Sequence, residues 1–191
     1  MDEQKLAEAL RNQEPEAVQE MVRAYGDRLL RSAFLLCGNE TDAEDLVQET
    51  FVQAIRSAHR FRARSTLYTW LHAILLNLSR HYHRERRRLV YDEEAGEREV
   101  VESAESPIGS DLEVSTRSLE EALRRLSGPH REVLVLRFYE ELKIGEIAAR
   151  LGLSKGTVKS RLHYALAETQ KLLPKEMNLF GGSGTNEIET R

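Results

Sequence analysis

Residues 144–167 read IGEIAARLGLSKGTVKSRLHYALA, a pattern that predicts two short helices joined by a tight turn. Gly152 stands where a helix end favours a left-handed residue, and Ser154 stands where the next helix needs an N-cap. Val158 and Leu162 give the second helix an inward face. The apolar face of the first helix consists of Ile144, Ile147, Ala148 and Leu151.

The outer face of the second predicted helix is polar and basic. Residues 143–171 hold six Lys or Arg against two Glu, in a chain whose formal net charge is -4. Paired amphipathic helices also occur in ordinary helical bundles, but the complete turn chemistry and the basic face favour a DNA-binding helix-turn-helix. Residues 155–167 would be its recognition helix. The side chains expected to face outward are Thr157, Lys159, Ser160, Arg161, His163 and Tyr164.

Charge is segregated along the chain. Residues 1–53 carry twelve acids against five bases, residues 54–88 carry nine Arg against one acid, and residues 89–117 carry nine acids against two Arg. Such blocks predict separate surfaces for separate partners. Residues 89–117 have few large apolar side chains and predict a flexible acidic linker, and the glycine-rich residues 175–191 predict a disordered tail.

The composition narrows the class of protein. A chain of 191 residues forms one or two domains. The one cysteine, Cys37, excludes an internal disulfide framework and fits a reducing cytoplasm; a small buried residue near a helix end is favoured over a redox sensor. No apolar run reaches the length of a membrane span, so no such span is expected, and the acidic, polar stretch MDEQKLAEAL does not predict a signal peptide.

Helical spacing continues through the amino-terminal half and predicts an all-α fold. A helix is expected from Pro15 to Cys37, and the next is expected to begin at Thr41 with Glu44 completing a capping box. The residues alone favour a solvated acidic outer face on that helix. Later, residues 130–139 place Val133, Leu134, Leu136 and Phe138 on an apolar face.

Aromatic and arginine side chains alternate over residues 56–80. A positive groove with aromatic platforms suits single-stranded nucleic acid, where each stacked base contributes about 1–3 kcal/mol. Packing of Trp70 in a helical core is the alternative. His72, His81 and His83 are expected to face solvent, because no Cys or carboxylate pair at ligand spacing accompanies them. The interleaved residues are Arg56, Arg60, Phe61, Arg62, Arg64, Tyr68, Trp70 and Arg80.

In their order, these parts resemble a bacterial extracytoplasmic-function (group 4) sigma factor of the sigma-70 family. The resemblance covers residues 10–173 and rests on DAEDLVQETFVQA (42–54), HRFRARSTLYTWLHAILLNLSRHYHRERRR (59–88), LRRLSGPHREVLVLRFYEELKIGEIAARLG (123–152) and LSKGTVKSRLHYAL (153–166). It implies a region 2 domain at 1–88, the linker at 89–117, a region 4 domain at 118–174 and the tail at 175–191. Such a protein is no enzyme and needs no cofactor or metal, because the polymerase performs the chemistry.

The resemblance also implies roles for particular residues. In the family, the segment like 45–54 docks on the clamp helices of the largest subunit of core RNA polymerase, which implies Asp45, Leu46, Gln48, Glu49 and Phe51. The loop like 61–66 holds a flipped base of the minus-ten element, the residue like Asn77 helps to select that base, and Trp70 would abut the upstream edge of the bubble. The single-strand contacts implied are Phe61, Arg62, Arg64, Ser65, Tyr68, Trp70, Asn77 and Arg80.

The helix-turn-helix would read the minus-thirty-five element as duplex. Base contacts are implied for Lys159, Ser160, His163 and Tyr164, and phosphate contacts for Lys155, Thr157 and Arg161. Members of the family are commonly held inactive by an anti-sigma factor, so such a partner is implied beside polymerase and promoter DNA.

Three positions depart from the family. Its loop commonly reads Phe-Arg-Gly followed by an acid, whereas this chain has Ala63 and Arg64; Tyr164 stands where many members have Arg. Two rival functions remain. A stand-alone helix-turn-helix regulator would bind duplex DNA as a dimer without polymerase, but it has no need of the arginine and aromatic residues at 56–88. The second rival is a histidine-dependent nuclease, but the sequence has neither the paired carboxylates nor the metal-ligand spacing that would support it.

Overall fold

A computed structural model describes residues 2–63, 65–93 and 111–173, with side chains over 2–63, 65–86 and 118–173. These residues form helices and no strand, which confirms the predicted all-α class. The chain divides into two compact units, residues 1–85 and 86–191. The first holds α1 (Glu3–Arg11), α2 (Pro15–Cys37), α3 (Glu40–Ser57), the short 3-10 helix η1 (Ala58–Arg60) and most of α4 (Leu67–Glu93). The second holds α5 (Asp111–Arg125), α6 (Gly128–Leu134), the π-helix η2 (Val135–Tyr139), α7 (Ile144–Leu151) and α8 (Lys155–Leu172).

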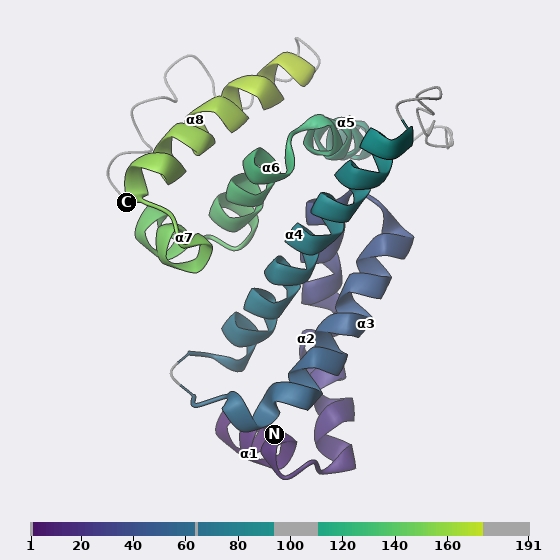
Figure 1. Cartoon of the computed structure of the whole chain (residues 1–191), viewed down its shortest axis with the longest axis vertical. Helices are drawn as coiled ribbons and strands as arrows, with labels where there is room; N and C mark the ends of the chain where they lie inside the picture. The colour runs from purple at the N-terminus through teal and green to yellow at the C-terminus, as the bar shows by residue number, and fades with distance from the viewer. Residues whose placement is uncertain (1, 64, 94–110, 174–191) are drawn as a thin grey trace. The chain divides into compact units, whose positions relative to one another are not determined.

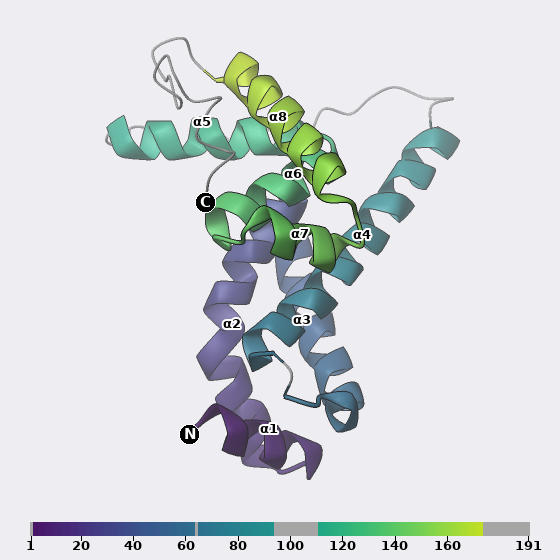
Figure 2. The same cartoon turned by 90° about the vertical axis from the view of Figure 1, so that its left-hand side faces the viewer.

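In the first unit, α2, α3 and α4 lie side by side and α1 crosses the end of this bundle (Figures 1 and 2). Pro15 opens α2, and Gly38 closes it in the left-handed conformation with φ 77°. Cys37 is buried, as predicted. The largest fully buried side chains of this core are Met21, Leu29, Leu67, Leu71, Leu75, Leu76 and His72.

Two expectations for this unit were wrong. Helix α3 begins at Glu40, because Asn39 rather than Thr41 is its N-cap and accepts the Asp42 N–H at 3.0 Å. His72 does not face solvent: it is fully buried, and its Nε2 lies 2.8 Å from the Ser32 hydroxyl. A buried imidazole is tolerated because it has such a partner.

The second unit packs α6 against α8 and α7 against α8. Pro129 lies in the first turn of α6, as the Gly-Pro break predicts. The next turn is a π-helix, whose extra residue shifts the side-chain register. This shift accounts for Phe138, which was expected to be inward but is 55% exposed.

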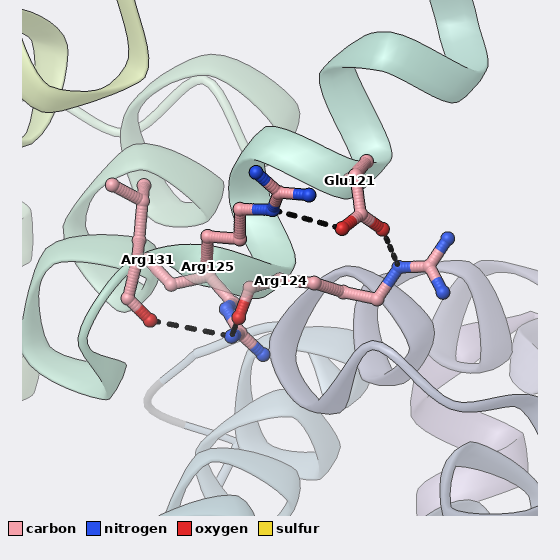
Figure 3. A network of polar contacts seen from close by, with 5 residues as sticks. Glu121, Arg124, Arg125 and Arg131 are labelled. Carbon is pink, nitrogen blue, oxygen red and sulfur yellow. Dashed lines mark hydrogen bonds and ion pairs between the residues drawn. The ribbon is translucent and has the colours of Figure 1, made fainter. Parts of the chain in front are cut away.

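The turn between α5 and α6 is closed by a buried arginine (Figure 3). Helix α5 ends at Arg125, so its last carbonyls lack partners within the helix. The Arg131 Nη2 donates to the carbonyl oxygens of Arg124 at 2.5 Å and of Leu126 at 3.3 Å. On the outer side, Glu121 contacts Arg124 and Arg125 at 3.5 and 3.0 Å. Arg131 therefore holds the end of α5 against the start of α6.

The boundary between the two units, after Glu85, lies close to the start of the predicted acidic linker at 89–117. Helix α4 runs to Glu93 and α5 begins at Asp111, so helix enters the predicted linker from both ends. Its central part, residues 94–110, and the predicted tail at 175–191 lie outside the described residues. Among the described helices, none combines the length and apolarity that crossing a membrane requires.

Candidate nucleic-acid interface

Helix α4 has a buried side and an exposed stripe. The buried side includes Leu67, Leu71 and Leu75, four residues apart, so the helix is seated by one apolar row. On the other side, Asn77 is exposed, and Trp70 and Arg80 are half-buried. Trp70 and Asn77 are seven residues apart and thus share a helix face. The stripe brings an aromatic ring, an amide and a guanidinium to one surface.

Polar contacts from distant parts of the chain fix α4 along its length. Near its middle is the His72–Ser32 pair already described. Further along, the Tyr82 hydroxyl donates to the Asp42 carboxylate at 2.5 Å. The His83 Nε2 lies 2.9 Å from the carbonyl oxygen of Leu36. These contacts tie α4 to α2 and α3, so the exposed stripe has a rigid support.

The loop before α4 runs from Phe61 to Thr66. Phe61 is buried, and its ring centroid lies 5.1 Å from that of Trp70. Ala63 has φ 52°, in the left-handed region that side chains with a Cβ rarely adopt. This is the position at which the resembling family commonly has glycine. Arg62 and Ser65 are exposed, whereas Arg64 lies outside the described residues.

Tyr68 supports the site from within. It is buried, and the Arg28 guanidinium carbon lies 3.8 Å above its ring centroid. Tyr25 and His72 flank the same ring at centroid distances of 6.2 and 5.7 Å. Phe61 and Tyr68, both predicted to contact DNA, are therefore packed beneath the exposed stripe in this structure. Burial raises the pKa of Tyr25, and the Glu3 carboxylate raises it further.

The acidic face of α3 is exposed. Asp45, Gln48 and Glu49 are on the surface, whereas Leu46 and Phe51 are buried in the core of the unit. Val52 is 38% exposed and was not among the predicted residues. Its spacing of seven residues from Asp45 is the sequence signal that could have placed it on this face. The face thus combines two carboxylates, an amide and one apolar side chain.

The helix-turn-helix agrees closely with its sequence pattern. Gly152 has φ 65°, and the Ser154 hydroxyl oxygen accepts the Thr157 N–H at 3.0 Å. Val158 and Leu162 are buried, as predicted. Helix α8 continues to Leu172, five residues beyond the predicted end, and the His130 Nδ1 contacts the Glu168 carboxylate at 2.9 Å in this extension.

The outer face of α8 carries the predicted recognition residues. Tyr164 is 62% exposed and its ring meets that of His163 edge to face, with centroids 5.6 Å apart. Thr157 and Arg161 are half-buried, and the exposed side chains are Lys155, Lys159, Ser160, His163 and Tyr164. Within residues whose side chains are described, no group of three potential metal-ligating His, Cys, Asp or Glu residues occurs.

Comparison with known proteins assigns each unit to a family. Residues 21–89 match the Sigma-70 region 2 family and residues 122–170 match Sigma-70, region 4. The RNA polymerase sigma factor SigV of Bacillus subtilis is 33% identical over 147 residues, which cover 76% of this chain and 84% of SigV. The ECF RNA polymerase sigma factor EcfG of Rhodopseudomonas palustris is 34% identical over 141 residues, 74% of this chain and 76% of EcfG. The chain spans 61% of the ECF sigma factor SigE of Mycolicibacterium smegmatis, at 36% identity over 82% of its own length.

A solved structure has a similar fold. The sigma factor RpoE of Bartonella quintana, in complex with the anti-sigma factor NepR, superposes with a TM-score of 0.64 at 31% identity and covers 81% of this chain and 94% of RpoE. A region 2 unit followed by a region 4 unit defines a protein of the sigma-70 class. More narrowly, the chain belongs to the extracytoplasmic-function (ECF) RNA polymerase sigma factors.

Proposed function

We propose that the two units read two promoter elements by different chemistry, within the promoter recognition and transcription initiation that the ECF family performs. The observation that supports this division is the pair of exposed faces: an aromatic, amide and guanidinium stripe on α4, and a polar, basic face on α8. We place the domains at 1–88 and 118–174, with a linker at 89–117 and a tail at 175–191.

The α4 stripe would capture the minus-ten element as a single strand. Opening duplex costs about 1.4 kcal/mol for each broken stacking step. Stacking a released base on Trp70 and pairing phosphates with Arg62, Arg64 and Arg80 offset part of that cost. Asn77 would select the flipped base through its amide. Phe61 and Tyr68 would act from below, as supports that position Trp70 and the loop.

The α8 face would read the minus-thirty-five element without opening it. A helix fits the major groove, where each base pair presents a distinct donor and acceptor pattern. Lys159, Ser160, His163 and Tyr164 would reach base edges, and Lys155, Thr157 and Arg161 would hold phosphates. Because Tyr164 has one hydroxyl in place of a guanidinium, it would not make the bidentate contact to guanine that Arg makes.

The acidic face of α3 would dock on the clamp helices of core RNA polymerase through Asp45, Gln48, Glu49 and the exposed Val52. Leu46 and Phe51 would shape this face from the core. The chain would then act in the cytoplasm as a subunit of the holoenzyme, with no catalysis or cofactor of its own. RpoE was solved bound to an anti-sigma factor, and we infer that this chain is also held by a protein of that class.

Co-purification with bacterial core RNA polymerase, followed by run-off transcription on a pool of candidate promoters, tests the proposal. Stoichiometric binding and new start sites are expected, and the transcripts then give the promoter. Glu49→Lys should abolish the association, because it reverses a charge on the docking face, whereas Glu8→Lys on α1 is the control. Tight binding to duplex DNA without core association would instead indicate a stand-alone regulator.

A further inference from the structure

Helix α1 meets both ends of the loop at 61–66. It packs against η1, whose last residue, Arg60, directly precedes the loop. At the other end, the Glu3 carboxylate accepts the backbone N–H of Leu67, the first residue of α4. Figures 1 and 2 both show α1 at the end of the bundle from which α4 starts. One helix therefore holds the residues before and after a six-residue segment.

The Glu3 carboxylate caps the Leu67 N–H, for which the described residues just before α4 provide no acceptor. The first N–H groups of a helix have no partner within the helix. Thr66 serves one of them, since its hydroxyl accepts the Thr69 N–H at 3.1 Å. Leu67 is 0% exposed, so water cannot easily replace Glu3 as its partner. A carboxylate at a helix N-terminus also interacts favourably with the helix dipole.

The position of α1 is itself fixed. Leu6, Ala7 and Leu10 are buried, so the helix is seated by an apolar face. The Glu3 charge also contributes to the raised pKa of Tyr25 on α2, which places that charge near a second element of the bundle. Tyr25 in turn flanks Tyr68, in the first turn of α4. Glu3 thus acts where α1, α2 and α4 meet.

We propose that Glu3 is a positioning residue for minus-ten recognition: delivered by α1, its carboxylate caps α4 and holds the loop at 61–66 and Trp70 in the arrangement that captures single-stranded DNA. The inference rests on the proposed function of that loop. It assigns α1, which lies before the matched region 2 segment at 21–89, an indirect part in promoter opening, through the position of α4 and the loop.

Trp70 is the only tryptophan of the chain and reports on this arrangement without DNA. In the full chain, Glu3→Ala should increase acrylamide quenching of Trp70 emission, because the first turn of α4 loosens. Glu3→Gln should quench nearly as the unchanged chain does, since its amide oxygen still accepts the Leu67 N–H. Glu8→Ala, at an exposed acid of the same helix, is the matched control and should have no effect.

The second readout uses holoenzyme and a promoter found by run-off transcription. For Glu3→Ala we expect an affinity for the single-stranded minus-ten non-template oligonucleotide that is about fivefold lower, the effect of losing one helix cap. Affinity for the minus-thirty-five duplex should stay unchanged. Rescue by Glu3→Gln would show that the hydrogen bond, rather than the charge alone, positions the loop.

Three results would overturn the inference. If acrylamide quenches Trp70 equally in Glu3→Ala and Glu8→Ala, Glu3 does not cap α4. Changed quenching with unchanged single-strand affinity would leave a cap with no part in recognition. If Glu3→Ala and the folded Glu3→Gln variant both lose affinity for the minus-ten oligonucleotide and for the minus-thirty-five duplex to the same degree, the substitutions damage the protein generally. If unchanged holoenzyme fails to initiate at all, the proposed function fails instead, and the quenching result still decides whether Glu3 caps α4.

Discussion

The helix-turn-helix and the α4 site are built by contacts of different range. The turn between α7 and α8 depends on Gly152 and on a Ser154–Thr157 bond between residues three apart. The α4 site depends on the Ser32–His72 and Glu3–Leu67 contacts, whose partners lie 40 and 64 residues apart. A helix-turn-helix can thus be specified locally, whereas the site that we propose captures single-stranded DNA requires the whole first unit to be assembled.

The largest effect is expected from removing a long-range contact of α4, the buried His72–Ser32 pair. His72→Ala should lower the free energy of unfolding of the first unit by about 2–5 kcal/mol, because it leaves a cavity and removes the partner of the Ser32 hydroxyl. Chemical denaturation followed by Trp70 emission measures this unit. His81→Ala, an exposed histidine of the same helix, is the control and should change stability by less than about 0.5 kcal/mol. Equal losses would mean that the buried pair does not anchor α4.

A smaller loss is expected from the local side. Ser154→Ala should cost the second unit about 1 kcal/mol, the usual value of an N-cap side chain. Thermal unfolding of the full chain, followed by circular dichroism, measures the change. Ser127→Ala is the matched control, since Ser127 is the N-cap of α6 without a side-chain hydrogen bond. A comparable loss in both variants would refute the local specification of the turn.

Ala63→Gly should shift stability in the opposite direction. Removing the Cβ relieves a left-handed strain of about 1–2 kcal/mol, and the greater freedom of glycine in the unfolded chain offsets about 0.5–1 kcal/mol. A small net stabilisation is therefore expected in denaturant melts. Ala24→Gly, in the exposed interior of α2, should instead destabilise by about 1 kcal/mol. Destabilisation by Ala63→Gly would show that the alanine side chain has a packing role.

The smallest effect concerns alkaline pH. Burial, and then the Glu3 charge, raise the pKa of Tyr25 above its ordinary value of 10.0. The folded chain therefore retains the phenolic proton at pH values where the unfolded chain has lost it, so stability falls as pH rises above about 10. Tyr25→Phe should remove this contribution and flatten the decline. Parallel curves of unfolding free energy against pH for both proteins would contradict the assignment.

The same difference in range explains what the sequence could predict. Gly152, Ser154 and the apolar spacing around them are local signals, and each was placed correctly. His72 was wrongly expected at the surface because its partner Ser32 lies on another helix, and no local pattern announces that contact. Phe138 was misplaced because a π-turn changes the register that regular helical spacing assumes. The Glu3 cap was not predicted because its partner, Leu67, also lies far away in the sequence.

Permanganate footprinting with holoenzyme on a promoter from the run-off screen tests the central claim, that the two units perform different steps. Trp70→Ala should abolish thymine reactivity in the minus-ten element and leave closed-complex binding nearly unchanged. Lys159→Ala should weaken closed-complex binding by about 1–3 kcal/mol if it reads a base, and the complexes that do form should open normally. Equal losses of binding and opening in both variants would contradict the division of labour between α4 and α8.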